Sequence, residues 1–355
     1  MMNTSTPARS ESRLQVLEPP AAVAPESLPA WAAQQRREQD GAALCVANLP
    51  GPGGAPVHWL EAAHARGWIA PQANTPVEAA ALQVKASEFL ARGFVGADAL
   101  LLAFLARDGA LPRLSWGETT TFAAPRAPSS RRLDLYAVVD SAARLRAALD
   151  AGVRTVQLRI KRPPAPDAAW HARLREDLAQ GIAAARACGA EFFVNDHWAL
   201  AAELGADAVH LGQEDLIALG EAGRRQLLAS GVALGISSHA VWELCRARAL
   251  SPRYIACGPV WPTTTKDMPW LPQGLDNLAW WQRQAGAPVV AIGGILEPQQ
   301  ARQAAACGVD GVCLVRALGE VPAQGVPEFA QALAAGRAAP APGAPDWPHP
   351  TLPHG

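Results

Sequence analysis

The chain has 355 residues, half of them apolar, and a formal net charge of −1 at pH 7. Such a composition can build a sizeable hydrophobic core, so we expect a globular protein with one large domain or two ordinary ones. A charge this close to zero gives no electrostatic footprint for nucleic acid or an anionic membrane, so small molecules bound by local clusters are the expected ligands.

Composition divides the chain into five segments. Residues 1–27 and 339–355 are rich in Ala, Pro and polar residues without apolar periodicity, which predicts disordered tails. The stretch 118–132, ETTTFAAPRAPSSRR, has the composition of a linker. It separates an N-terminal segment, 28–117, from a C-terminal domain, 133–338.

The N-terminal segment is predicted to be a small, mainly helical extension. Residues 76–93 and 96–109 have helical patterns, and AALCVAN at 42–48 reads as a strand. We find no catalytic motif in it and interpret it as a remnant or a docking module.

Short β-like runs alternate with helical patterns through the C-terminal domain. The runs cover residues 133–139, 155–161, 191–197, 207–215, 232–239, 253–261, 288–295 and 311–318. Eight βα units in about 205 residues predict an α/β fold of the (β/α)8 TIM-barrel class, with a doubly wound open sheet as the main alternative. Both folds bind ligands at the carboxyl ends of their strands.

The second run, TVQLRIK, alternates apolar and polar side chains. Its period of two places Gln157, Arg159 and Lys161 on one face, which points into the barrel if the apolar face meets the helices. Two cations buried there need a counter-charge, either an anionic ligand or an acid on a neighbouring strand.

Acidic residues end the third and fourth runs. Asn195 and Asp196 end one and Asp215 the other, so adjacent parallel strands would bring the two carboxylates together. Two carboxylates beside cations suit Mg²⁺, which takes one or two carboxylates together with waters and phosphate oxygens. The predicted ligand is a magnesium diphosphate, although the two acids could instead cap the helices that follow.

The later runs add phosphate-binding and histidine candidates. Gly293 and Gly294 follow the seventh run, where barrels commonly bind phosphate, although any tight turn can use Gly-Gly. Lys266, in GPVWPTTTK after the sixth run, is one of only three lysines in the chain. His210 is expected to be a core histidine, and the role of His239 stays open.

The lack of a targeting segment and the cysteine pattern favour the cytoplasm. The N-terminus lacks the apolar stretch of a secretory signal, and no apolar run reaches the ~20 residues of a membrane span. The six cysteines have no C-x-x-C spacing, so buried free thiols are favoured over disulfides or zinc ligands.

Six motifs in order, QLRIK, FFVNDHW, VHLGQEDL, LGISSH, GPVWPTTTK and AIGGI, resemble the successive signatures of thiamine phosphate synthase, also called thiamine-phosphate pyrophosphorylase. The resemblance covers about residues 133–337. It implies a Mg²⁺-dependent transferase that joins hydroxymethylpyrimidine diphosphate to hydroxyethylthiazole phosphate, giving thiamine monophosphate and diphosphate by dissociative substitution. A homo-oligomer, or contact with another thiamine-pathway enzyme, is left open.

Carried over position by position, the resemblance implies a metal pair, catalytic cations and a substrate-binding set. Asp196 and Asp215 would bind Mg²⁺, and Arg159, Lys161 and Lys266 would neutralise charge on the departing diphosphate. The implied substrate-binding set is Gln157, Leu158, Arg159, Ile160, Lys161, Asn195, Ser237, Thr263, Thr264, Thr265, Lys266, Gly293, Gly294, Val315 and Arg316.

Two features need separate interpretation. Arg316 stands where the family usually has serine, and we favour a charge-assisted bond to the thiazole phosphate over a crowded site that alters the acceptor. Residues 89–106 resemble the C-terminal helices of hydroxymethylpyrimidine phosphate kinases, but the Gly-rich turn and catalytic acid of those enzymes are missing.

A thiazole tautomerase of the same fold, marked by His239, and a non-catalytic thiamine-phosphate sensor remain as alternatives.

Overall fold

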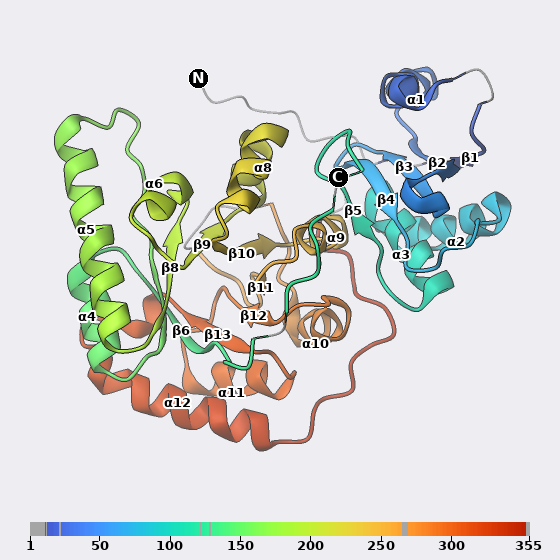
Figure 1. Ribbon diagram of the computed structural model, residues 1–355. Helices are drawn as coiled ribbons and strands as arrows, with labels where there is room; N and C mark the ends of the chain where they lie inside the picture. Colours follow the sequence, from blue (N-terminus) through green and yellow to red (C-terminus); the bar gives the residue numbers. More distant parts are fainter. Residues whose placement is uncertain are drawn as a thin grey trace.

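The structure is a computed structural model that describes residues 11, 13–20, 23–120, 122–127, 129–264 and 269–352. Figure 1 shows a barrel with its surrounding helices and, beside it, a smaller module of sheet and helices formed by the N-terminal part of the chain. No helix within these ranges is long and apolar enough to cross a membrane.

The C-terminal domain is a closed barrel, which confirms the predicted (β/α)8 class. Closure is shown by the last strand, which pairs in parallel with the first from Gly311↔Asp134 to Leu314↔Ala137, and it excludes the open-sheet alternative. The strands, all parallel, are β6 (Asp134–Val139), β7 (Thr155–Leu158), β8 (Glu191–Asn195), β9 (Ala208–Leu211), β10 (Ala233–Ser238), β11 (Tyr254–Cys257), β12 (Val289–Ala291) and β13 (Gly311–Leu314).

Helices cover the outside of the barrel (Figure 1). They are α4 (Ala142–Asp150), α5 (Ala168–Ala187), α6 (Trp198–Glu203), α7 (Gln213–Ala218), α8 (Gly220–Ala229), α9 (Val241–Ala249), α10 (Gly274–Gln284), α11 (Pro298–Ala306), η3 (Arg316–Leu318) and α12 (Pro322–Ala338).

Alternating side chains of the strands serve two cores. In β7, Val156 and Leu158 face the helices and join the large outer core, as the period of two predicts. A smaller inner core fills the barrel with Tyr136, Phe193, Tyr254 and their neighbours. After the first, the predicted runs are longer than the strands at their carboxyl ends, because the alternation continues into the loops after the ladder hydrogen bonds stop.

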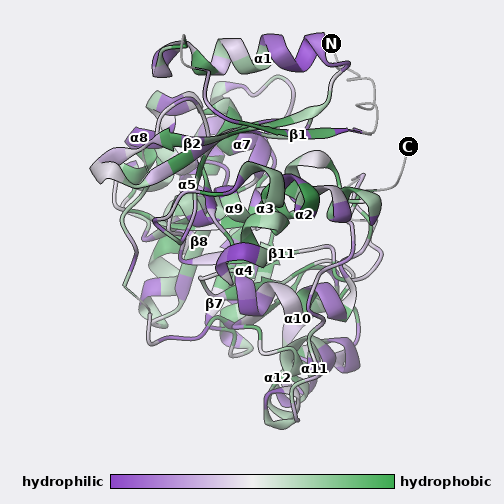
Figure 2. Cartoon of the chain, turned by 90° about the vertical axis from the view of Figure 1, so that its right-hand side faces the viewer, coloured by the Kyte–Doolittle hydropathy of each residue, from purple (hydrophilic) through white to green (hydrophobic). Residues whose placement is uncertain are grey.

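The N-terminal module is more than the helical extension that the sequence predicts. The predicted strand and both predicted helices are present, but they belong to a five-stranded sheet with helices on both faces. The elements are β1 (Leu14–Leu17), η1 (Pro25–Ser27), α1 (Leu28–Glu38), β2 (Ala43–Pro50), η2 (Pro52–Gly54), β3 (Pro56–Glu61), β4 (Arg66–Ala70), α2 (Ala79–Ala91), α3 (Gly96–Asp108) and β5 (Arg113–Leu114). Figure 2 shows α1 above the sheet and α2 and α3 below it.

Both predicted tails contain ordered structure. β1, within 1–27, pairs in parallel with β2. Within 339–355, Trp347 packs edge-on against Phe89 at 4.8 Å, and the amide of His349 donates to Asn277 Oδ1 at 2.8 Å. The prediction of disorder in these described stretches was wrong, because a few apolar and aromatic side chains dock on surfaces that only the folded chain provides.

Candidate active site

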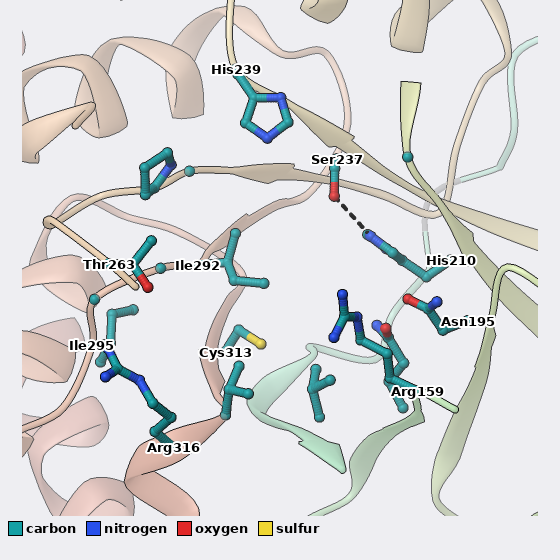
Figure 3. A pocket seen from close by; sticks show the side chains of 18 of the residues that line it. Arg159, Asn195, His210, Ser237, His239, Thr263, Ile292, Ile295, Cys313 and Arg316 are labelled. Carbon is teal, nitrogen blue, oxygen red and sulfur yellow. Dashed lines mark hydrogen bonds between the residues drawn. The ribbon is translucent and has the colours of Figure 1, made fainter. Parts of the chain in front are cut away.

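A cavity of about 470 Å³ lies at the carboxyl ends of the barrel strands. Figure 3 shows its side chains converging from several strand ends, with Arg159 and Asn195 on one side and Thr263, Ile295 and Arg316 on the other. The predicted site residues that line it are Gln157, Arg159, Asn195, Asp196, Asp215, Ser237, Thr263, Gly293, Gly294, Val315 and Arg316.

Other predicted residues lie elsewhere. Leu158 is buried in the outer core and Ile160 packs against that core, so neither side chain lines the cavity, as strand alternation requires. Lys161 is exposed and does not line the cavity either. Thr264 is exposed and does not line the cavity, although its neighbour Thr263 does. Thr265 and Lys266 lie outside the described residues.

Asp196 and Asp215 face the cavity from neighbouring strand ends. Burial raises the pKa of Asp196, and the charge of Asp215 raises it further, while His197 and Arg159 oppose the shift. Asp196 also has a φ of 63°, a left-handed conformation that is uncommon outside glycine and clusters at functional sites. The two carboxylates thus share one electrostatic environment.

Asp215 has a structural role as well. It lies in the first turn of α7, where its Oδ2 accepts from the amide of Gly212 at 2.9 Å. The helix-capping alternative therefore holds for Asp215, whereas the described contacts of Asp196 include no such cap. Within the described ranges no three His, Cys, Asp or Glu side chains form a metal cluster. Two carboxylates nevertheless fit Mg²⁺, because this ion takes its remaining ligands from water and phosphate.

A chain of hydrogen bonds crosses the inside of the barrel and reaches the cavity at Gln157, His210 and Ser237. Gln157 Nε2 donates to Tyr136 Oη at 2.8 Å, and the hydroxyls of Tyr136 and Tyr254 are 2.8 Å apart. Tyr254 Oη lies 2.6 Å from His210 Nδ1, and His210 Nε2 lies 2.9 Å from Ser237 Oγ, the bond drawn in Figure 3.

The direction of this chain follows from its first donor. An amide nitrogen only donates, so Tyr136 accepts from Gln157 and is satisfied if its own proton goes to Tyr254, which then donates to His210 Nδ1. Burial lowers the pKa of His210 to about 3, so the ring is neutral and carries its one proton on Nε2, toward Ser237. Ser237 thereby keeps its own hydroxyl proton for a ligand.

A model of the thiamine monophosphate synthase family matches residues 135–318, just over half of the chain and nearly all of the barrel strands that build the cavity. The chain belongs to this family. Its activity is that of a thiamine-phosphate synthase, a transferase, as the resemblance of the six motifs predicts. The match does not extend to the N-terminal module, whose likeness to kinase helices stays a prediction.

Two sequence relatives, both thiamine-phosphate synthases, agree with the assignment. The thiamine-phosphate synthase of Neisseria meningitidis serogroup A is 45% identical over 193 residues, which cover 54% of this chain and 89% of that protein. The thiamine-phosphate synthase of Rhizobium etli is 46% identical over 166 residues, 46% of this chain and 77% of that protein. Among solved structures, the thiamine phosphate pyrophosphorylase from Pyrococcus furiosus is 27% identical with a TM-score of 0.49, covering 57% of this chain and 96% of that one.

At the opposite end of the synthase cavity, the backbone at Gly293 and Gly294 lies very close to the loop after β11. Gly294 has a φ of 72°, and a Cβ there would lie 2.6 Å from Trp261 Cβ. Gly293, with a φ of 92°, is equally close to Pro259. Only glycine fits this tight turn, and its phosphate-binding role stays a prediction. Arg316 Nη1 donates to Thr264 Oγ1 at 3.3 Å and links the loops after β13 and β11.

Sequence reasoning missed two residues of the buried hydrogen-bond chain and left the role of His239 open. Tyr136 and Tyr254, the chain's two tyrosines, complete the buried chain, and inward-facing tyrosines on barrel strands are a signal that could have identified them. His239 lines the cavity with a defined partner: its Nδ1 lies 2.8 Å from Glu243 Oε2.

Proposed function

We propose that this synthase condenses hydroxymethylpyrimidine diphosphate with hydroxyethylthiazole phosphate in the cavity, with Mg²⁺ held by Asp196 and Asp215. The observation that carries the proposal is the pair of acids itself: both line one cavity with Arg159, and the charge of Asp215 raises the pKa of Asp196. Like charges that repel in this way are relieved when a divalent cation joins them.

The pyrimidine end fits the hydrogen-bond chain. Gln157 Nε2 donates to Tyr136, and the side-chain carbonyl oxygen of Gln157 stays available as an acceptor. Ser237 keeps a hydroxyl donor. An aminopyrimidine presents the complementary pattern, an exocyclic amine that donates and ring nitrogens that accept. The hydrogen-bond chain thus positions one donor, Ser237, and one acceptor, Gln157, for the heterocycle.

The reaction breaks the carbon–oxygen bond between the pyrimidine methylene and diphosphate, and the electron pair leaves with the diphosphate. The thiazole nitrogen then donates its lone pair to the resonance-stabilised pyrimidine cation, forming the new carbon–nitrogen bond. Apolar walls from Val138, Ile292 and Cys313 keep water from that cation. No protein nucleophile is required.

Charge on the leaving group is neutralised by cations. Mg²⁺, when bound, supplies electrostatic stabilisation of the departing diphosphate. Arg159 lines the cavity and acts on the same group, and Asn195 beside it donates to a phosphate oxygen. Lys161 lies outside the lining, so it reaches the diphosphate only if the loop after β7 closes. Lys266 stays a proposed catalytic residue of the loop after β11.

The thiazole phosphate occupies the opposite end in this proposal. Thr263, the turn at Gly293 and Gly294, the backbone at Val315 and the Arg316 guanidinium converge there. Thr264 and Thr265 belong to the same loop and extend this phosphate site. We also place the enzyme in a reducing cytoplasm, which suits the six free cysteines, five of them buried.

One assay tests the proposal. The purified protein is incubated with both phosphorylated substrates and Mg²⁺, and thiamine monophosphate and diphosphate are measured. We expect both products in equal amounts, and neither when EDTA removes the metal. A thiazole tautomerase or a sensor would form no thiamine monophosphate, and metal-independent turnover would remove Asp196 and Asp215 from the proposed role.

A further inference from the structure

Helix α9 begins without a cap of its own. Its N-cap residue is Ala240, which has no side-chain acceptor, and the first helical residues Val241 and Trp242 are buried. Buried amides without partners are costly, so an acceptor must come from elsewhere. Asp98 of α3, in the N-terminal module, supplies it: its Oδ1 accepts from the Trp242 amide at 2.8 Å.

The same helix carries the partner of His239. Glu243 is buried in the first turn of α9, and its Oε2 accepts from both the backbone amide of His239, at 2.7 Å, and Nδ1 of its ring, at 2.8 Å. With Nδ1 engaged, Nε2 is the ring nitrogen left for a ligand. Figure 3 shows the imidazole beside Ser237 at the edge of the cavity.

A row of rings forms a second connection between the module and His239. His64, between β3 and β4, lies 5.4 Å from Trp242, and Trp242 lies 5.4 Å from Trp270. Trp270 stacks on His239 at 5.3 Å with an interplanar angle of 7°. Trp270 therefore holds the plane of the imidazole, and Glu243 holds its edge. Glu243 belongs to α9, and Trp270 contacts Trp242 of α9.

Additional contacts dock α9 on the module. Trp116 Nε1 donates to Arg246 O at 2.8 Å, and Arg246 Nη2 donates to Arg66 O at 3.0 Å. Figure 1 shows α9 on the side of the barrel that faces α3. We propose that the N-terminal module is a positioning element of the active site, acting through Asp98 and α9 to set the orientation of His239 on the cavity wall.

Two substitutions at Asp98 test the inference, which rests on the proposed function only for its kinetic readout. Asp98→Ala removes the acceptor, and we expect kcat/KM to fall about tenfold, since small misplacements of a site group carry such losses. Asp98→Asn keeps an oxygen in place and should restore kcat/KM to within about twofold of the parent, because Asn caps helices as well as Asp does.

A double-mutant cycle separates positioning from general damage. In a His239→Gln background, Asp98→Ala should have little further effect on kcat/KM, because its route to the substrate is already lost. The histidine ¹⁵N NMR signals give a reading that needs no turnover: in the parent, His239 should show a proton fixed on Nδ1, and in Asp98→Ala a mixture of tautomers.

Gln83→Ala is the matched control. It also removes one side-chain acceptor from a backbone amide of the module, that of Val16 at 2.9 Å, but on the β1 side of the sheet. We expect lower thermal stability with kcat/KM within about twofold of the parent. The inference is overturned if folded Asp98→Ala keeps the parental His239 signals, if its effect persists unchanged in the His239→Gln background, or if Gln83→Ala matches it in kinetics.

Discussion

Asp196 and Asp215 face one cavity from neighbouring strand ends, and the charge of Asp215 raises the pKa of Asp196. β8 and β9, which carry them to this edge, pair in parallel with Asn195 opposite His210. The repulsion between the carboxylates is the electrostatic basis of the proposal that Asp196 and Asp215 would hold a divalent cation.

Asp196→Asn should lower kcat by about a hundredfold, the usual scale for a lost electrostatic stabiliser, while the protein stays folded. The KM for the thiazole phosphate should change little, because the substitution lies at the other end of the cavity. Glu214→Gln, which removes an acid from the same cavity wall, is the control and should retain most of the activity. Parental kcat in folded Asp196→Asn would exclude Asp196 from the mechanism.

Lys161→Ala tests whether an exposed lysine takes part in catalysis. If the loop after β7 brings its charge to the departing diphosphate, kcat should fall by about a hundredfold. The neighbouring Arg162, also exposed, is the matched control, and Arg162→Ala should leave kcat within about twofold. Steady-state kinetics of both variants decide the matter, and equal behaviour would restrict catalysis to Arg159 and the remaining cations.

Arg316→Ser should raise the KM for the thiazole phosphate by about tenfold, since it removes a charge-assisted hydrogen bond of about 1.5 kcal/mol. The KM for the pyrimidine diphosphate should be unchanged, because Arg316 lies across the cavity from Arg159 (Figure 3). Arg302→Ser, at an exposed position of α11, is the control. A lower KM for the thiazole phosphate would instead show that Arg316 crowds the acceptor site.

Tyr254→Phe should weaken pyrimidine binding without opening the barrel. The phenyl ring keeps its packing on Phe193 at 5.1 Å, but His210 Nδ1 loses its donor and the ring can reverse its tautomer. Ser237 would then donate to His210 rather than to the substrate. We expect the KM for the pyrimidine diphosphate to rise several-fold, because one net hydrogen bond contributes about 1 kcal/mol. The KM for the thiazole phosphate should be unchanged.

Asp98 should make stability depend on pH. Burial raises its pKa from 3.8 to about 7, with Glu243 adding to the shift and the Trp242 and Val241 amides opposing it. The folded state therefore holds a proton that the unfolded state loses between about pH 4 and 7, so stability falls as the pH rises through this window. Relative to the parent, Asp98→Asn should gain stability from pH 4 to pH 7 in urea unfolding. A difference that is constant with pH would contradict the raised pKa.

The sequence predicted the barrel well because its signal is local. Each strand run and each following helix repeats within a few tens of residues, and the polar side chains at the run ends, such as Arg159 and Asp196, mark the edge of the barrel that bears the cavity. The motif resemblance then ordered them into one site, and the cavity brings most of them together.

What the sequence could not give depends on contacts between distant segments. Asp98 and Trp242 are 144 positions apart, and nothing in either local pattern predicts that one caps the helix of the other. The order of β1 and of the residues around Trp347 likewise depends on partners that folding assembles. Strand alternation could have removed Leu158 from the substrate-binding set, because it already placed that side chain toward the helices.

The most direct test of the account is a crystal structure with Mn²⁺ in place of Mg²⁺ and inorganic diphosphate, read by anomalous scattering. The account predicts one metal peak within coordinating distance of carboxylate oxygens of both Asp196 and Asp215, with the diphosphate beside Arg159. A metal bound elsewhere in the cavity, or diphosphate bound with neither carboxylate engaged, would contradict it.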